Sequence, residues 1–164
     1  DSWLMNTSLA LVSDFTHAGR PVLGVCLGAQ AISKVAGGVI APSAFELGFG
    51  KVSPVKTHRF FQNAALETND WDCFQWHGEN FTLPPGFEKL FEGNVVSNQG
   101  FTFKNALGLQ FHNELSFEWY SMWYESLRHK FENMDKLVPP SPGMPFTALK
   151  KNLFALLDVW QKNW

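Results

Sequence analysis

The sequence has little of what marks several large classes of protein. Its 164 residues include only two cysteines, too few for a disulfide framework, and this favours a reducing compartment such as the cytoplasm. Apolar runs stay far below the ~18 residues that span a bilayer. With 13 Lys and Arg against 15 Asp and Glu, the net charge of -2 provides no positive field for nucleic acid. We therefore expect no membrane segment and no nucleic-acid partner.

What the chain does have is an ordinary globular composition with many aromatic residues. Hydrophobic residues make up 45% and charged residues 17%, which excludes disorder for the chain as a whole. The length suits one domain over residues 1–164. The 16 Phe, 7 Trp and 2 Tyr indicate an extensive hydrophobic core, or an apolar surface that contacts a partner protein.

The first part of the chain alternates helical and strand patterns. Apolar residues recur at helical spacing over residues 8–18, and residues 21–25 form a continuous apolar run typical of a buried parallel strand. Residues 29–36 are a helical segment of small residues that ends at two glycines. This succession indicates an α/β architecture.

The rest of the chain predicts short strands and then two helices. The strands are expected over residues 51–55, 71–76, 89–97, 100–103 and 106–111. A long amphipathic helix is predicted over residues 115–137, and a second helix begins near residue 146. We expect the apolar faces of both helices to cover the sheet. The alternative for the last helix is that its Trp-rich end docks on another protein.

The most informative segment is residues 21–30, Pro-Val-Leu-Gly-Val-Cys-Leu-Gly-Ala-Gln, where a strand runs through Gly-x-Cys-x-Gly into a helix. This is the thiol form of a nucleophile elbow, a tight turn that exposes the nucleophile in a strained conformation. Gly24 and Gly28 are expected there because a Cβ would collide with the neighbouring turn. The Cys26 sulfur then lies at a helix N-terminus, which favours the thiolate. The alternative is a structural cysteine between packing glycines.

Two neighbours of Cys26 are placed to act on a substrate. The Leu27 N–H points toward any oxyanion that forms beside the sulfur. Gln30 lies one turn later on the same helix face, within reach of a bound substrate.

A thiol nucleophile needs a base, and His112 is the best placed of the five histidines. It ends the strand-like residues 107–111 and is followed two residues later by Glu114. This spacing puts both side chains on one side while the strand persists, so Glu114 can accept a hydrogen bond from one ring nitrogen. The other ring nitrogen is left to face the sulfur. The alternative is a surface histidine beside an acid.

Three separated motifs resemble the class I (triad) glutamine amidotransferases. They are the elbow at 21–30, Gln-Trp-His-Gly-Glu at 75–79 with Leu-Pro-Pro-Gly-Phe at 83–87, and Gly-Leu-Gln-Phe-His-Asn-Glu at 108–114. The middle motif is similar to the GMP-synthase-like branch. The resemblance implies a flavodoxin-like, three-layer α/β fold. Its open sheet would be mostly parallel, with helices on both faces and a small antiparallel β extension.

The resemblance also implies roles for particular residues. Cys26 would be the nucleophile, His112 the base and Glu114 its orienting acid. The implied reaction is hydrolysis of the side-chain amide of L-glutamine through a γ-glutamyl thioester, with ammonia passed to an unknown acceptor. Nothing here resembles a synthetase domain, so an acceptor-activating synthetase would be a separate partner.

The same resemblance implies a substrate-binding set around the nucleophile. Leu27 would supply a backbone oxyanion donor, and Gln30 would hold the glutamine head group. The backbone around Trp76, His77 and Gly78 would complete this set, with the His77 side chain structural rather than catalytic.

No metal and no cofactor are expected. Cys73 matches no functional position of the family and is expected in the core. The Cys73-x-x-x-His77 spacing resembles half a zinc site, but no second pair follows at ligand spacing.

The chain departs from the family's pattern in two places. Asn113 stands where the nearest relatives often have proline. The family's domain also opens with a strand, a helix, a strand and a Gly-Gly-Pro-type turn that helps form the oxyanion hole, and none of the roughly twenty residues before the elbow strand forms that turn. We therefore expect an N-terminally truncated domain that lacks one or two βα units.

Two other functions stay open at this point. A γ-glutamyl peptide hydrolase would use the same triad, because the acyl half of the reaction is identical. A catalytically inactive binding or regulatory module would keep the fold without the reaction.

Overall fold

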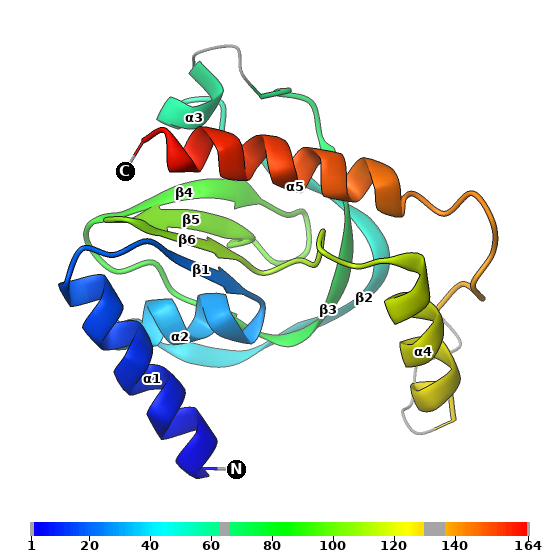
Figure 1. The fold of residues 1–164 in the computed structure, drawn as a ribbon, viewed down its shortest axis with the longest axis horizontal. Helices are drawn as coiled ribbons and strands as arrows, with labels where there is room; N and C mark the ends of the chain where they lie inside the picture. Colours follow the sequence, from blue (N-terminus) through cyan, green and yellow to red (C-terminus); the bar gives the residue numbers. More distant parts are fainter. Residues whose placement is uncertain (1, 63–65, 130–136, 164) are drawn as a thin grey trace.

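The computed structural model describes residues 2–62, 66–129 and 137–163 and has the α/β architecture that the sequence indicates (Figure 1). The helices are α1 (Ser2–His17), α2 (Leu27–Val35), α3 (Arg59–Gln62), α4 (Phe117–Leu127) and α5 (Phe146–Gln161). The strands are β1 (Val22–Val25), β2 (Ile40–Pro54), β3 (Trp71–Phe81), β4 (Phe87–Glu92), β5 (Gly100–Phe103) and β6 (Ala106–Leu109). No helix in these described ranges is long and apolar enough to cross a membrane.

A six-stranded sheet in the order β1-β6-β5-β4-β2-β3 forms the centre of the molecule. β1 and β6 pair in parallel, whereas the other four neighbouring pairs of described strands are antiparallel. The expected mostly parallel sheet is therefore not found among the described strands. The connections explain this: Lys104 and Asn105 alone join β5 to β6, and so short a link returns the chain antiparallel.

Helices cover both faces of this sheet, as the three-layer expectation requires (Figure 1). On one face, Ile32 of α2 packs with Phe101 and Ala106. On the opposite face, Leu156 of α5 packs with Leu109. Ala106 and Leu109 both belong to β6, where alternate side chains point to opposite faces. β6 is thus buried on both sides, and its carboxyl end leads directly into the predicted base.

The two C-terminal helices differ from their sequence predictions. α4 begins after Ser116, whose hydroxyl accepts the Trp119 N–H at 3.2 Å, and it ends at Leu127 rather than near residue 137. The predicted continuation over residues 130–136 lies outside the described residues. α5 buries Trp160 in the core, so this residue does not form the docking surface considered above, while Trp164 lies outside the described residues.

The strand predictions are right in place, and the strand expected over residues 100–103 also has the right length, whereas the others differ in length. The strand expected over residues 51–55 is only the end of the 15-residue β2. One proline and two glycines hid the rest, and the pairing with β3 is irregular between Pro42 and Glu46, near that proline. The strand expected over residues 89–97 lies at Phe87–Glu92.

Candidate active site

Cys26 occupies the turn between β1 and α2. Its backbone has φ 51° and ψ -106°, a conformation that a non-glycine residue adopts only when the surrounding structure enforces it. The Cys26 N–H donates to the Leu109 carbonyl at 2.7 Å, and the Cys26 carbonyl accepts the Gln30 N–H at 3.1 Å. The first bond ties the turn to β6, and the second is the first hydrogen bond of α2. The strand, the turn and the helix have the geometry of a nucleophile elbow.

The two glycines around Cys26 differ in what a side chain would meet. A Cβ at Gly24 would lie 2.5 Å from the backbone of Gly28 and 2.6 Å from Ile32. A Cβ at Gly28 would meet no described atom within 4 Å. The sequence-based expectation of a collision is therefore right for Gly24 and wrong for Gly28, because the helix surface beside Gly28 is open.

His112 and Glu114 lie together at the end of β6. The His112 N–H donates to the Phe74 carbonyl at 2.7 Å, which ties the end of β6 to β3. The His112 Nδ1 lies 2.6 Å from a Glu114 carboxylate oxygen. The Glu114 side chain is 43% exposed, whereas that of His112 is only 13% exposed. The carboxylate is thus solvated on one side and holds the ring on the other.

The charge state of His112 is set by opposing influences. Burial is the largest of them and lowers the pKa of His112. Hydrogen bonds to Cys26 and Glu114, and the negative charges of both groups, together outweigh burial and raise the pKa to about 9. Around neutral pH the imidazole is therefore protonated beside the sulfur.

Other groups approach the Cys26 sulfur from two further elements. The Trp76 carbonyl of β3 lies 3.9 Å from it, and the Gln110 amide nitrogen lies 3.6 Å from it. The Trp123 ring of α4 packs edge-on against the rings of both His112 and Trp76, at 6.0 and 5.2 Å between centroids. The sulfur and its base are thus enclosed by protein on several sides.

A pocket of about 290 Å³ begins beside the nucleophile. It is lined by Leu27, Gln30, Ala31, Lys34, Ile40 and Glu79. Gln30 is buried, and its Nε2 donates to the Glu79 carbonyl at 3.5 Å. A larger and shallower hollow of about 440 Å³ lies at the end of β2, but it borders no residue of the elbow or of the His112–Glu114 pair. The smaller pocket adjoins the elbow through Leu27, the residue that follows Cys26.

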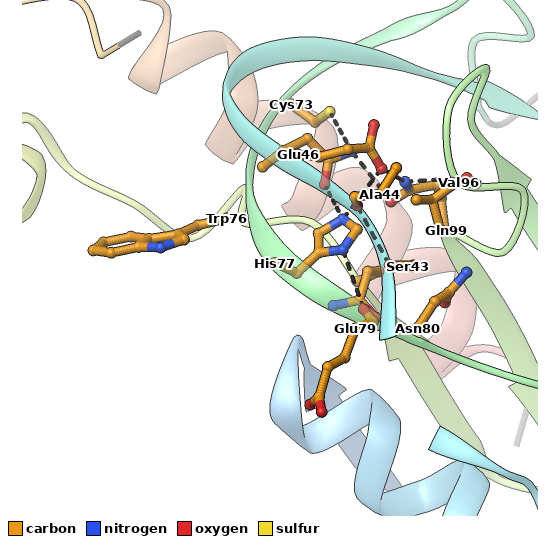
Figure 2. A network of polar contacts seen from close by, with 12 residues as sticks. Ser43, Ala44, Glu46, Cys73, Trp76, His77, Glu79, Asn80, Val96 and Gln99 are labelled. Carbon is orange, nitrogen blue, oxygen red and sulfur yellow. Dashed lines mark hydrogen bonds and ion pairs between the residues drawn. The ribbon is translucent and has the colours of Figure 1, made fainter. Parts of the chain in front are cut away.

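The His77 side chain belongs to a buried polar network between β2 and β3 (Figure 2). Its Nε2 lies 3.0 Å from Gln75 Oε1 and 3.3 Å from a Glu46 carboxylate oxygen, and its Nδ1 lies 3.2 Å from the Glu79 carbonyl. Gln99 donates to the same Glu46 oxygen at 2.8 Å and accepts from Gln75 at 3.1 Å. This network holds the strand that carries Trp76 and Glu79.

Gly78 and the Trp76 side chain lie outside that network. Figure 2 shows the Trp76 ring pointing away from His77, so it is the Trp76 backbone carbonyl that faces the Cys26 sulfur. A Cβ at Gly78 would lie 3.2 Å from the Phe45 ring, so the glycine permits close packing of β2 on β3.

The sequence profile of the glutamine amidotransferase class-I family matches residues 4–122. The chain belongs to this family. The resemblance read from three sequence motifs is thereby confirmed, including the GMP-synthase-like branch.

Relatives of this glutamine amidotransferase include several GMP synthases. A glutamine-hydrolysing GMP synthase of Thermomicrobium roseum is 35% identical over 102 residues, which cover 61% of this chain and 19% of that protein. One of the subunits of the glutamine-hydrolysing GMP synthase of Methanobrevibacter smithii is 34% identical over 103 residues, which cover 60% of this chain and 53% of that smaller protein. The alignment thus spans about half of the smaller protein, and far less of the longer synthase.

Solved structures agree with the family assignment. A glutamine amidotransferase from Thermotoga maritima superposes with a TM-score of 0.78 at 28% identity, covering 94% of this chain and 68% of that one. A glutamine amidotransferase from Methylobacillus flagellatus superposes with a TM-score of 0.80 at 22% identity, covering 96% and 68%, and supports the fold alone.

Several residues near the candidate site had no role assigned to them from the sequence. Glu46 is a single acid in the apolar stretch Ala-Phe-Glu-Leu-Gly-Phe, and an acid so placed signals a buried partner such as His77. Lys34 gave no local signal of its pocket, and Glu79 stood in the middle motif without an assigned role. Trp123 had the spacing of a core residue, yet its ring contacts His112.

The two cysteines are expected to differ sharply in reactivity. Cys73 is fully buried, and this burial, with the nearby charges of Glu46 and Asp72, raises the pKa of its thiol to about 12. Cys26 is partly exposed and contacts a protonated His112. Limited alkylation with iodoacetamide at neutral pH, followed by peptide mapping, should label Cys26 first. Preferential labelling of Cys73 would contradict the elbow geometry.

Proposed function

We propose that this chain hydrolyses the side-chain amide of L-glutamine through a Cys26–His112–Glu114 triad and a γ-glutamyl thioester. One observation carries the proposal: a strained thiol at a helix N-terminus lies near enough to a histidine to raise its pKa, and that histidine bonds a carboxylate at 2.6 Å. Membership of the class I glutamine amidotransferase family supports the same chemistry.

The first half of the reaction forms the thioester. The Cys26 thiolate attacks the carboxamide carbon, and the carbonyl electrons move to oxygen. The Leu27 N–H is placed to donate to that oxyanion, because the first N–H groups of a helix have no partner within it. His112 then gives its proton to the amide nitrogen as the C–N bond breaks, and ammonia leaves.

The second half releases glutamate. The neutral His112 now accepts a proton from a water molecule while the water oxygen attacks the thioester carbon. The C–S bond breaks and the thiolate returns beside the imidazolium. Glu114 keeps its carboxylate charge throughout and holds Nδ1, so that the other ring nitrogen faces the sulfur.

The pocket beside Leu27 suits the head group of an amino acid. It carries one cation, Lys34, and one anion, Glu79, which are the charges that complement a carboxylate and an ammonium group. Gln30 adds a buried amide to the same wall. We assign glutamine to this pocket with its side-chain amide directed to Cys26.

We further propose that the ammonia passes to a synthetase on another chain, in the cytoplasm. Several relatives are named as one of the subunits of a GMP synthase, which implies that a further chain completes the enzyme in those proteins. A reducing compartment suits a free thiol nucleophile such as Cys26.

The test is glutamate release measured with the full-length protein, alone and with a candidate synthetase. L-Glutamine should yield glutamate and ammonia in equal amounts, and acid quenching should trap a γ-glutamyl adduct on Cys26. A γ-glutamyl peptide serves as the competing substrate. Faster cleavage of the peptide would favour a γ-glutamyl hydrolase, and turnover of neither substrate would favour an inactive module.

The pH dependence of the rate should have its alkaline limb near the pKa of His112. That pKa is raised to about 9, so the proton needed by the departing ammonia is present below this pH and lost above it. We expect kcat/KM for glutamine to fall as pH rises through about 9. Glu114→Gln removes the charge that holds the proton and should move this limb to lower pH. A limb that stays in place would contradict the assigned role of Glu114.

A further inference from the structure

Gln110 is a fully buried amide in contact with the nucleophile. It follows β6 directly and stands two residues before His112. Its Nε2 lies 3.6 Å from the Cys26 sulfur, within the range of an N–H···S hydrogen bond. Neither the sequence motifs nor the family match assigns a role to this side chain.

The burial of this amide is only partly compensated. Gln110 Oε1 accepts no hydrogen bond from the described part of the chain, and a buried acceptor without a partner destabilises a folded protein. A methionine of similar length would fill the same space without that penalty. The amide is therefore better explained by what its nitrogen does at the sulfur than by packing.

The backbone holds the amide in place. The Gln110 N–H donates to the Gln99 carbonyl at 2.9 Å, and Gln99 belongs to the polar network of Glu46 and His77. Cys26 is anchored on the same strand end, through its N–H bond to the Leu109 carbonyl at 2.7 Å. The Cys26 backbone is thus bonded to Leu109, and the Gln110 side chain belongs to the next residue. This arrangement holds the amide and the sulfur close together.

An N–H donor discriminates between the two forms of a thiol. A thiolate is a charged acceptor and gains a charge-assisted hydrogen bond, whereas a neutral thiol is a weak acceptor. A hydrogen bond that favours the charged form shifts the equilibrium toward it. The imidazolium of His112 acts on the sulfur in the same sense.

We propose that the Gln110 amide is a further catalytic group that stabilises the thiolate of Cys26. The proposal deepens, and rests on, the assignment of Cys26 as the glutaminase nucleophile. Gln110 binds the attacking sulfur in the free enzyme, and the bond weakens once the sulfur becomes a neutral thioester. Its loss should therefore reduce the fraction of reactive thiolate while leaving the fold in place.

The test is the alkylation rate of Cys26 by iodoacetamide between pH 5 and pH 10, read by peptide mapping in the full-length protein. In Gln110→Met the midpoint of the pH profile should rise by about one unit, with the high-pH plateau rate unchanged. Gln110→Asn keeps an amide but withdraws it from the sulfur by one methylene, and it should show the same rise. The midpoint belongs to the coupled Cys26–His112 pair.

Asn113→Leu is the matched control. Asn113 is also a buried amide with an unpartnered oxygen, but its nitrogen donates to the Asp72 carbonyl at 3.3 Å rather than to the sulfur. Its midpoint should stay at the wild-type value. An unchanged midpoint in both Gln110 variants, or an equal rise in Asn113→Leu, would overturn the proposal. Alkylation needs no glutamine, so a protein without glutaminase activity still tests Gln110 independently of the proposed function.

Discussion

Cys26→Ala should reduce glutamate release from glutamine by about 10⁴-fold or more, because no other group in the site can form the thioester. Glu114→Gln should cost far less, about 100-fold. The amide of the substituted residue 114 still accepts a hydrogen bond from Nδ1 of His112. This position is 43% exposed, so water can solvate the imidazolium in place of part of the lost carboxylate interaction. The measurement is the initial rate of glutamate formation at saturating glutamine.

Cys73→Ala is the control for removal of a thiol. Cys73 lies in a core cluster that contains no triad residue, and its sulfur accepts a hydrogen bond from Gln75, so this variant should lose some stability but keep its rate per folded molecule. Equal losses in Cys26→Ala and Glu114→Gln would show that Glu114 takes a direct part in the chemistry. Residual turnover of Cys26→Ala close to wild type would rule out the covalent route.

Gly24→Ala should be the most destabilising conservative change near the site, by about 3 kcal/mol or more in the free energy of unfolding. The new methyl group would lie 2.5 Å from the backbone of Gly28 and 2.6 Å from Ile32. The backbone of α2 would have to move away from β1, and Cys26 lies in the turn that joins them. Urea unfolding followed by circular dichroism measures the loss.

Gly28→Ala is the control for the collision expected in Gly24→Ala. This position lies in the first turn of α2 and offers open space to a methyl group, so the variant should fold normally. Alanine also lowers the conformational entropy of the unfolded chain, which predicts a gain of about 0.5 to 1 kcal/mol. If both glycine variants were equally destabilised, strain of the elbow rather than the Gly24 contact would be the cause.

The sequence was informative where chemistry is encoded in contiguous residues. The strand, Cys26 and the following helix are neighbours in the chain, so Gly-x-Cys-x-Gly predicted the turn before any tertiary contact was known. His112 and Glu114 are two residues apart, and the expected contact between them is found at 2.6 Å, although β6 already ends at Leu109. The α/β class and the positions of β5 and β6 were likewise readable from local apolar runs.

The sequence failed where distant segments decide the outcome. The antiparallel pairing of five strands depends on which segments meet across the sheet. An apolar run predicts a strand but does not show whether it pairs parallel or antiparallel with its neighbour. The Gly28 prediction failed for a related reason: a motif shows that a glycine is present, but only its surroundings show whether a side chain would fit.

By itself, then, the sequence determined the family and the helix and strand types, and it predicted a nucleophile with its base and acid, because each rests on residues close together in the chain. Only the tertiary structure decided what surrounds the sulfur. Gln110 lies 84 positions from Cys26 in the chain, and its amide reaches the sulfur only because β6 pairs with β1. Trp123 reaches His112 only because α4 lies beside that strand end. Such contacts depend on long-range pairing and packing, which local patterns do not encode.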